Sequence, residues 1–237
     1  MSATKRTPTA SQLAKLIDHT LLRPTATPAD FARLFSEAVT YRFWSACVPP
    51  SMVAAAARRL RGSGVKVCTV VGFPLGFSSA ASKRDEALLA IEDGADEIDM
   101  VMNIGAFKGG DRAAVRREVE EVARACGAEK KVLKVIIECC YLTDEEKVDA
   151  ARIAGRAGAD FVKTSTGFGP GGATVEDVAL LHETLHGSAK VKASGGISTL
   201  AKALGMINAG AERIGTSSSV VIMEELSGSK GRGVRRR

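Results

Sequence analysis

One short stretch of the chain places a lysine where its amine could act as a nucleophile. Residues 160–167 read Asp-Phe-Val-Lys-Thr-Ser-Thr-Gly, so Lys163 follows two good strand formers and precedes a loop. A lysine at the end of a buried strand is partly removed from water. Desolvation disfavours its charged form, which lowers its pKa and makes the amine nucleophilic. Taken alone, however, Lys163 is more simply interpreted as a strand-end lysine that extends into solvent.

Other charged residues lie within or beside apolar segments in the same way. Lys134 and Lys192 each follow strand-forming residues, and Asp99 lies within the segment 97–101. Two ammonium groups close together cannot both stay charged at low cost, so one loses its proton near neutral pH. Such an amine can form a Schiff base with a carbonyl compound. A nearby carboxylate could then carry the protons for dehydration and carbon–carbon cleavage.

Two glycine- and serine-rich loops indicate an anion site. Residues 194–196 read Ser-Gly-Gly before one predicted helix, and residues 215–218 read Gly-Thr-Ser-Ser before another. Glycines let backbone N–H groups approach an anion, and a helix N-terminus adds its dipole. Either loop alone is a weak signal, but their paired position predicts a phosphate site.

Strand and helix patterns must position these residues. The predicted strands are short and continuously apolar, which is typical of parallel strands buried on both faces. They lie near residues 16–22, 43–48, 65–71, 97–101, 133–137, 161–163, 191–193 and 213–215. Helical patterns lie between them, near residues 28–38, 51–61, 82–93, 111–126, 143–157, 175–186 and 198–209, with a closing helix to about residue 226.

This alternation predicts an α/β protein with a single-domain (β/α)₈ TIM barrel over residues 11–226. A doubly wound open sheet is the alternative, but no GxGxxG follows the first strand. In a barrel, the C-terminal ends of the strands share one mouth. That mouth would collect Asp18, Cys47, Asp99, Asn103, Lys134, Glu138, Lys163, Lys192, Ser217 and Ser218.

Composition and charge restrict the classes of function. The first ten residues are polar and read as a flexible leader, not a secretory signal. The five cysteines show no CxxC spacing, which favours reduced thiols in the cytoplasm over a disulfide framework or a zinc site. No apolar run is long enough to cross a membrane.

The net charge of +6 is concentrated at the C-terminus. Five basic residues lie in the last eleven positions, and without them the net charge is +1. Residues 227–237 are therefore expected to form a disordered basic tail. A nearly neutral body predicts no specific nucleic-acid partner.

Several longer phrases resemble, in order, the motifs of the deoxyribose-phosphate aldolases, a family of class I aldolases on the barrel fold. These phrases are IDHTLL at 17–22, VGFPLG at 71–76, EIDMV at 97–101, KVIIE at 134–138, FVKTSTGF at 161–168, VKASGGI at 191–197 and RIGTSS at 213–218. The resemblance extends from residue 16 to about 220.

The resemblance implies reversible cleavage of 2-deoxy-D-ribose 5-phosphate to D-glyceraldehyde 3-phosphate and acetaldehyde, with no metal or other cofactor. Lys163 matches the Schiff-base lysine, Lys192 matches a second lysine that depresses the pKa of the first, and Asp99 matches the acid/base carboxylate. The implied substrate-binding residues are Asp18 and Lys134, which line and support the site, and the phosphate contacts Gly167, Gly195, Gly196, Ser217 and Ser218. The Thr166 hydroxyl is expected to contact the sugar, and Cys47 could face the mouth, although a small buried cysteine is commoner.

The chain departs from the family at two places. Cys139 and Cys140 follow Glu138 where a threonine is expected at the first position, and the C-terminal tyrosine of some members is absent. His19 is predicted to be a structural hydrogen-bond partner, because the implied reaction already assigns its catalytic roles to other residues.

Three functional interpretations remain open at this point. Besides the family's own reaction, the chain could be another Schiff-base barrel aldolase acting on a different phosphosugar. It could also be a phosphate- or nucleic-acid-binding protein that has lost its chemistry, although Lys163, Lys192 and Asp99 argue against this. Barrels of this kind often pair, so a homodimer is one assembly to consider, without an interface signature in the sequence.

Overall fold

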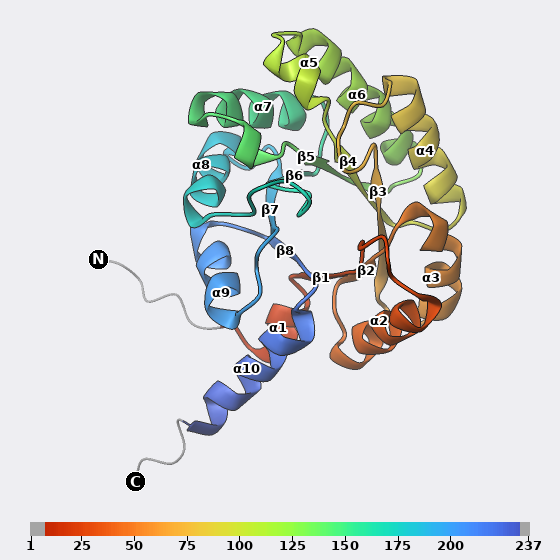
Figure 1. Cartoon of the computed structure of the whole chain (residues 1–237), viewed down its shortest axis with the longest axis vertical. Helices are drawn as coiled ribbons and strands as arrows, with labels where there is room; N and C mark the ends of the chain where they lie inside the picture. Colours follow the sequence, from red (N-terminus) through yellow and green to blue (C-terminus); the bar gives the residue numbers. More distant parts are fainter. Residues whose placement is uncertain (1–7, 233–237) are drawn as a thin grey trace.

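The computed structural model describes residues 8–232, and within this range eight parallel strands close into a barrel (Figure 1). The strands are β1 (Ile17–Thr20), β2 (Ser45–Cys47), β3 (Lys66–Val71), β4 (Glu97–Val101), β5 (Val132–Ile136), β6 (Phe161–Lys163), β7 (Lys190–Ser194) and β8 (Arg213–Thr216). The predicted (β/α)₈ barrel is confirmed. The open doubly wound sheet is excluded, because β1 pairs with β8.

Helices surround the strands (Figure 1). They are α1 (Ala10–Ala14), α2 (Pro28–Tyr41), α3 (Val53–Leu60), α4 (Ala80–Glu92), α5 (Ile104–Lys108), α6 (Arg112–Ala128), α7 (Asp144–Arg156), α8 (Val175–Leu185), α9 (Leu200–Ala209) and α10 (Ser219–Arg232). Two 3₁₀ turns, η1 (Pro50–Met52) and η2 (Cys139–Tyr141), complete the described elements. Thr27 and Thr143 are the N-caps of α2 and α7, and each forms a capping box with the residue three positions later.

The end of the chain differs from the prediction. The helix α10 continues to Arg232 and lies beside α1, so the boundary expected at residue 226 falls inside a helix. Residues 1–7 of the predicted leader and residues 233–237 of the predicted tail lie outside the described residues. None of the helices in residues 8–232 combines the length and the apolar character that crossing a membrane requires.

The strand register places charged side chains together inside the barrel. Residues paired across parallel strands point to the same face. Lys163 of β6 pairs with Lys192 of β7, which in turn pairs with Arg213 of β8. Asp99 of β4 pairs with Lys134 of β5. All five residues are buried, so the barrel interior is charged as well as apolar.

Candidate active site

Seven buried ionisable side chains meet inside the barrel. They are Asp18 from β1, Glu97 and Asp99 from β4, Lys134 from β5, Lys163 from β6, Lys192 from β7 and Arg213 from β8. The set contains four cationic side chains and three carboxylates, so one positive charge is unbalanced when all are ionised. An uncompensated buried charge is costly. A neutral amine on one lysine removes that imbalance.

Asp99 is the carboxylate on which three lysines converge. Its Oδ1 lies 2.7 Å from the Lys134 Nζ, and its Oδ2 lies 2.7 Å from the Lys163 Nζ and 2.6 Å from the Lys192 Nζ. Burial opposes the charged carboxylate, but the three lysines outweigh it and hold the pKa of Asp99 well below its usual range. Asp99 is therefore ionised at neutral pH.

Lys192 bridges two carboxylates. Its Nζ lies 2.6 Å from the Asp18 Oδ2 and 2.6 Å from the Asp99 Oδ2. Burial disfavours the ammonium, but Asp18 and Asp99 together raise the pKa of Lys192 above its ordinary value. Lys192 thus stays charged, and its charge lies next to the Lys163 amine because both nitrogens contact the same Asp99 oxygen.

Lys163 differs from Lys134 and Lys192 because it borders a cavity. A cavity of about 350 Å³ lies over the C-terminal ends of β6, β7 and β8, and Lys163 is part of its wall. Lys134 and Lys192 do not line this cavity and are at most 1% exposed. A small carbonyl compound in the cavity could therefore reach the Lys163 amine, with Asp99 directly behind it.

Loops rich in glycine and serine line another part of the cavity. All five residues predicted to contact a phosphate lie there: Gly167, Gly195, Gly196, Ser217 and Ser218. The loop after β6 and the loop after β7 lie close to each other here. A Cβ on Gly172 would lie only 2.3 Å from the Gly195 carbonyl oxygen, so glycine is required at position 172. Gly195 has a φ of +87°, which only glycine adopts readily. The N-terminus of α10 begins just beyond Ser218, and its dipole favours an anion.

Comparison with known proteins decides the family. The family model described as "DeoC/LacD family aldolase" matches residues 12–223. The chain belongs to this aldolase family. A curated relative named deoxyribose-phosphate aldolase, from Carboxydothermus hydrogenoformans, is 55% identical over 219 residues, which cover 92% of this chain and 96% of the relative. The aldolase resemblance that the sequence motifs indicate is therefore confirmed.

Solved structures of related aldolases share the barrel. A putative deoxyribose-phosphate aldolase from Coccidioides immitis superposes with a TM-score of 0.90 at 38% identity, covering 94% of this chain and 88% of that one. A deoxyribose phosphate aldolase from Aeropyrum pernix, described as a unique tetramer, superposes with a TM-score of 0.87 at 36% identity, covering 92% of each chain.

A deeper charged layer supports this aldolase site, and the sequence did not single it out. The Arg213 guanidinium lies 2.8 Å from both Asp18 and Glu97. Glu97 also lies 2.7 Å from the Lys134 Nζ and accepts a hydrogen bond from the Trp44 indole. The available signal was the two-residue spacing of Glu97 and Asp99, which puts both side chains on one face of β4.

Three predicted substrate-binding residues lie beneath the cavity and do not form its wall. Asp18, Lys134 and Cys47 are fully buried and absent from the cavity lining. Asp18 and Lys134 instead hold Lys192 and Asp99 in place, which agrees with the supporting part of their predicted role. Asn103, expected at the mouth, caps α5 through its side chain.

Thr166 lines the cavity, but its hydroxyl is already engaged. It donates a hydrogen bond to the buried Glu138 carboxylate, which also accepts from the Thr166 backbone N–H at 3.1 Å. Glu138 has a φ of +54° and so turns back from the end of β5 toward this loop. Glu138 therefore holds the loop after Lys163, and Thr166 offers the cavity a positioned hydroxyl that is already hydrogen-bonded.

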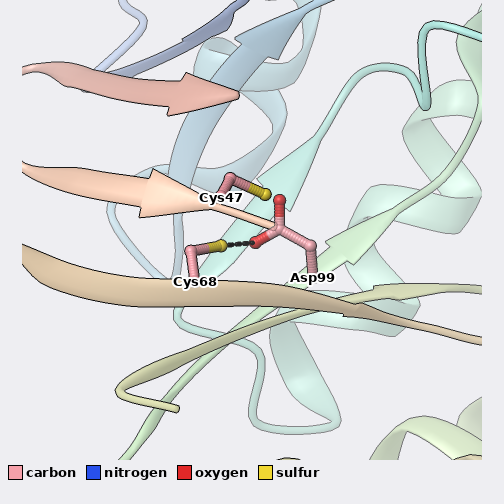
Figure 2. A group of neighbouring side chains, drawn as sticks. All are labelled: Cys47, Cys68 and Asp99. Atoms are coloured by element: carbon pink, nitrogen blue, oxygen red, sulfur yellow. Dashed lines mark hydrogen bonds between the residues drawn. The ribbon is translucent and has the colours of Figure 1, made fainter. Parts of the chain in front are cut away.

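Two cysteines lie beside Asp99 and supply potential metal ligands. Figure 2 shows Cys47 of β2 and Cys68 of β3 next to Asp99, with the Cys68 thiol 3.3 Å from Oδ1. Ligand atoms of these three residues lie within 4.8 Å of one another, as do those of Asp18, Cys68 and Glu97. In both groups the carboxylates already contact ammonium or guanidinium groups, so a metal ion would have to displace them.

Arg23 is a cavity residue that the sequence did not single out. It lies in the loop between β1 and α2 and lines the cavity together with Ser217 and Ser218. Its guanidinium lies 2.7 Å from Asp30 and is half exposed. This cation is close to the predicted phosphate contacts, and no pattern around residue 23 distinguished it from a surface arginine.

Proposed function

We propose that this chain catalyses the reversible cleavage of 2-deoxy-D-ribose 5-phosphate to D-glyceraldehyde 3-phosphate and acetaldehyde, through a Schiff base on Lys163. One observation carries the proposal: the Lys163 amine lies on a cavity wall and shares an Asp99 oxygen with the charged Lys192. The names of the related aldolases support the substrate.

The chemistry begins with the neutral Lys163 amine. It adds to the C1 aldehyde of the open-chain sugar, and loss of water gives a protonated Schiff base. Asp99, acting through water, takes the proton of the C3 hydroxyl. The C2–C3 bond breaks, its electron pair moves toward the iminium nitrogen, and C3 leaves as the aldehyde of glyceraldehyde 3-phosphate. The remaining enamine takes a proton at C2, and water then releases acetaldehyde and the free amine.

Lys192 supports this sequence by its charge. Its ammonium contacts the same Asp99 oxygen as the Lys163 amine, so a positive charge lies directly beside the proposed nucleophile. The same charge holds Asp99 in position for proton transfer. Gly167, Gly195, Gly196, Ser217 and Ser218 are the proposed phosphate contacts, because their backbone lines the cavity at a helix N-terminus.

A substrate panel tests the proposal. Purified protein should convert 2-deoxyribose 5-phosphate to acetaldehyde and glyceraldehyde 3-phosphate in a coupled assay, and Lys163→Ala should abolish turnover. Cleavage of another phosphosugar with higher kcat/KM would instead support an aldolase with a different substrate. If the wild-type protein cleaves no member of the panel, the proposal is wrong.

The location and assembly are part of the same proposal. We place the enzyme in the cytoplasm, supported by cysteines that are all free in the structure. We further propose that copies of the chain associate at least into homodimers, as expected for barrels of this kind. The partner in catalysis is a small phosphosugar, with no role for nucleic acid or membrane.

A further inference from the structure

His19 lies next to the active site but outside the chemistry described above. It is 3% exposed, at the C-terminal end of β1, with its ring against Phe43 at a centroid distance of 5.0 Å. Both ring nitrogens are hydrogen-bonded: Nε2 lies 2.9 Å from the Glu37 Oε2, and Nδ1 lies 2.9 Å from the Ser219 Oγ. These contacts form a chain of hydrogen bonds from the partly exposed Glu37 of α2, through the buried His19 of β1, to the first residue of α10.

The Glu37 carboxylate fixes the direction of one of these hydrogen bonds. A carboxylate only accepts, so the His19 Nε2–H donates to Glu37. Burial lowers the pKa of His19, and Glu37 only partly offsets this, which favours the neutral ring at pH 7. Nδ1 of the neutral ring is an acceptor, so the Ser219 hydroxyl has two acceptors within reach, the His19 Nδ1 at 2.9 Å and the Thr216 carbonyl oxygen at 3.2 Å.

The segment attached to Ser219 is the one that faces the proposed phosphate. Ser217 and Ser218 line the active-site cavity on one side. They also line a second hollow of about 260 Å³, whose walls include His19 and Glu37. With hollow space on two sides, this segment depends on hydrogen bonds at its ends. Thr216 accepts from the Ser218 N–H at 2.9 Å, and Ser219 provides the bond to His19.

We propose that His19, oriented by Glu37, is a positioning residue that holds the N-terminus of α10 in place for the phosphate group of the substrate, acting through Ser219. The inference rests on the proposed function, because it assumes that Ser217 and Ser218 face a phosphate. It extends that function to a residue 200 positions away from Ser219 in the chain, which touches no substrate itself.

The test compares a phosphorylated with an unphosphorylated substrate. Ser219→Ala and His19→Phe each remove the bond between residues 19 and 219. Ser219→Ala also removes the bond to the Thr216 carbonyl, whereas His19→Phe leaves that bond intact and keeps the ring contact with Phe43. Both should raise KM for 2-deoxyribose 5-phosphate roughly three- to tenfold, as expected for one lost hydrogen bond. For 2-deoxyribose, which has no phosphate, kcat/KM should stay unchanged. His19→Asn, whose amide can accept near the Nδ1 position, should restore part of the affinity.

Ser188→Ala is the matched control. Its hydroxyl bonds the Leu185 carbonyl at 2.7 Å between α8 and β7, at the opposite end of the barrel, so neither substrate should be affected. An equal loss with both substrates, or no loss with either, would overturn the inference. Calorimetric titration with inorganic phosphate compares the phosphate affinity of the wild type with that of the Ser219 and His19 variants without the need for turnover. If the wild type cleaves nothing but the Ser219 and His19 variants bind phosphate more weakly, the proposed function falls and the inference stands.

Discussion

At the scale of single residues, the three buried lysines Lys134, Lys163 and Lys192 differ in their surroundings because their ion-pair partners differ. Lys134 contacts Glu97 and Asp99, and Lys192 contacts Asp18 and Asp99. After the cost of burial, these carboxylates raise the pKa of both lysines, which therefore remain charged. Lys163 has only Asp99 among its described ion-pair partners and alone of the three reaches the cavity. These contacts, and not the residue type, distinguish Lys163 from the other two lysines.

Replacing Lys192 tests the role of its charge. In Lys192→Met the Asp99 Oδ2 and the Asp18 Oδ2 each lose the 2.6 Å contact with the Lys192 Nζ. The Asp99 carboxylate is then less firmly positioned beside the Lys163 amine, so kcat/KM for 2-deoxyribose 5-phosphate should fall at least about tenfold, since small displacements of positioned groups are costly. Steady-state kinetics measure the loss.

The matched control for Lys192→Met is Lys83→Met. Lys83 is also fully buried and lies 2.7 Å from Glu118, but this pair is between α4 and α6, outside the barrel interior. Both variants remove a buried ammonium from a carboxylate that keeps other partners, and both should lose stability. Only the Lys192 variant should lose kcat/KM. A loss of equal size in Lys83→Met would contradict the assigned role.

At the scale of elements, the loops after β6, β7 and β8 approach each other closely at the end of the cavity where we propose that the phosphate binds. Ala173 donates its backbone N–H to the carbonyls of Ser194 and Gly195, so the β6 loop is tied directly to the β7 loop. The Glu138 carboxylate fixes the same β6 loop from the end of β5. The shape of the site thus depends on backbone contacts between loops that are distant in sequence.

A methyl group at Gly172 should disturb this arrangement. In Gly172→Ala the new Cβ would meet the Gly195 carbonyl oxygen at 2.3 Å, and backbone on both sides has little freedom to move. The β7 loop must shift, so KM for 2-deoxyribose 5-phosphate should rise at least about tenfold, since small displacements of positioning groups are costly. Steady-state kinetics measure the change. Gly127→Ala, with open space around its Cβ, should leave KM unchanged, and similar kinetics in both variants would contradict the account.

Much of the fold and the central residues could be predicted from sequence, for a physical reason. Short apolar segments indicate parallel strands whose C-terminal ends share one mouth, so Lys163, Lys192 and Asp99 are predicted to lie close together, and the structure brings them together. Their roles in catalysis come from the family resemblance and stay predictions. The layer of Glu97 and Arg213 was not identified, because recognising it requires the register across the closed barrel. The hydrogen bond between His19 and Ser219 was not identified either. It joins β1 to the segment that follows β8, and these two parts of the chain meet only because the barrel closes.

At the scale of the whole molecule, a buried charged layer makes stability depend on pH. Burial opposes the charged forms of Asp18, Glu97 and Asp99, but the surrounding lysines and arginine outweigh it and lower the pKa of each carboxyl. The contribution of such groups is complete above their unfolded pKa values of about 4 and is lost as pH falls toward the lower folded values.

Acid should therefore destabilise the protein through these carboxylates. Between pH 7 and pH 5 they contribute little change. Below about pH 4 the free energy of unfolding should fall by up to about 1.4 kcal/mol per pH unit for each carboxylate, because the unfolded chain binds protons that the folded chain does not. Urea denaturation at several pH values measures the slope. A free energy of unfolding that stays constant from pH 5 to pH 3 would contradict this account.

The central claim is that Lys163 forms the Schiff base, and reductive trapping tests it most directly. The protein is incubated with acetaldehyde and sodium borohydride, digested and analysed by peptide mass spectrometry. The account predicts an ethyl group on Lys163, loss of activity in proportion to its formation, and no ethylation at Lys134 or Lys192. Ethylation elsewhere with Lys163 unmodified, or an equal amount of ethyl adduct in Lys163→Ala, would contradict it.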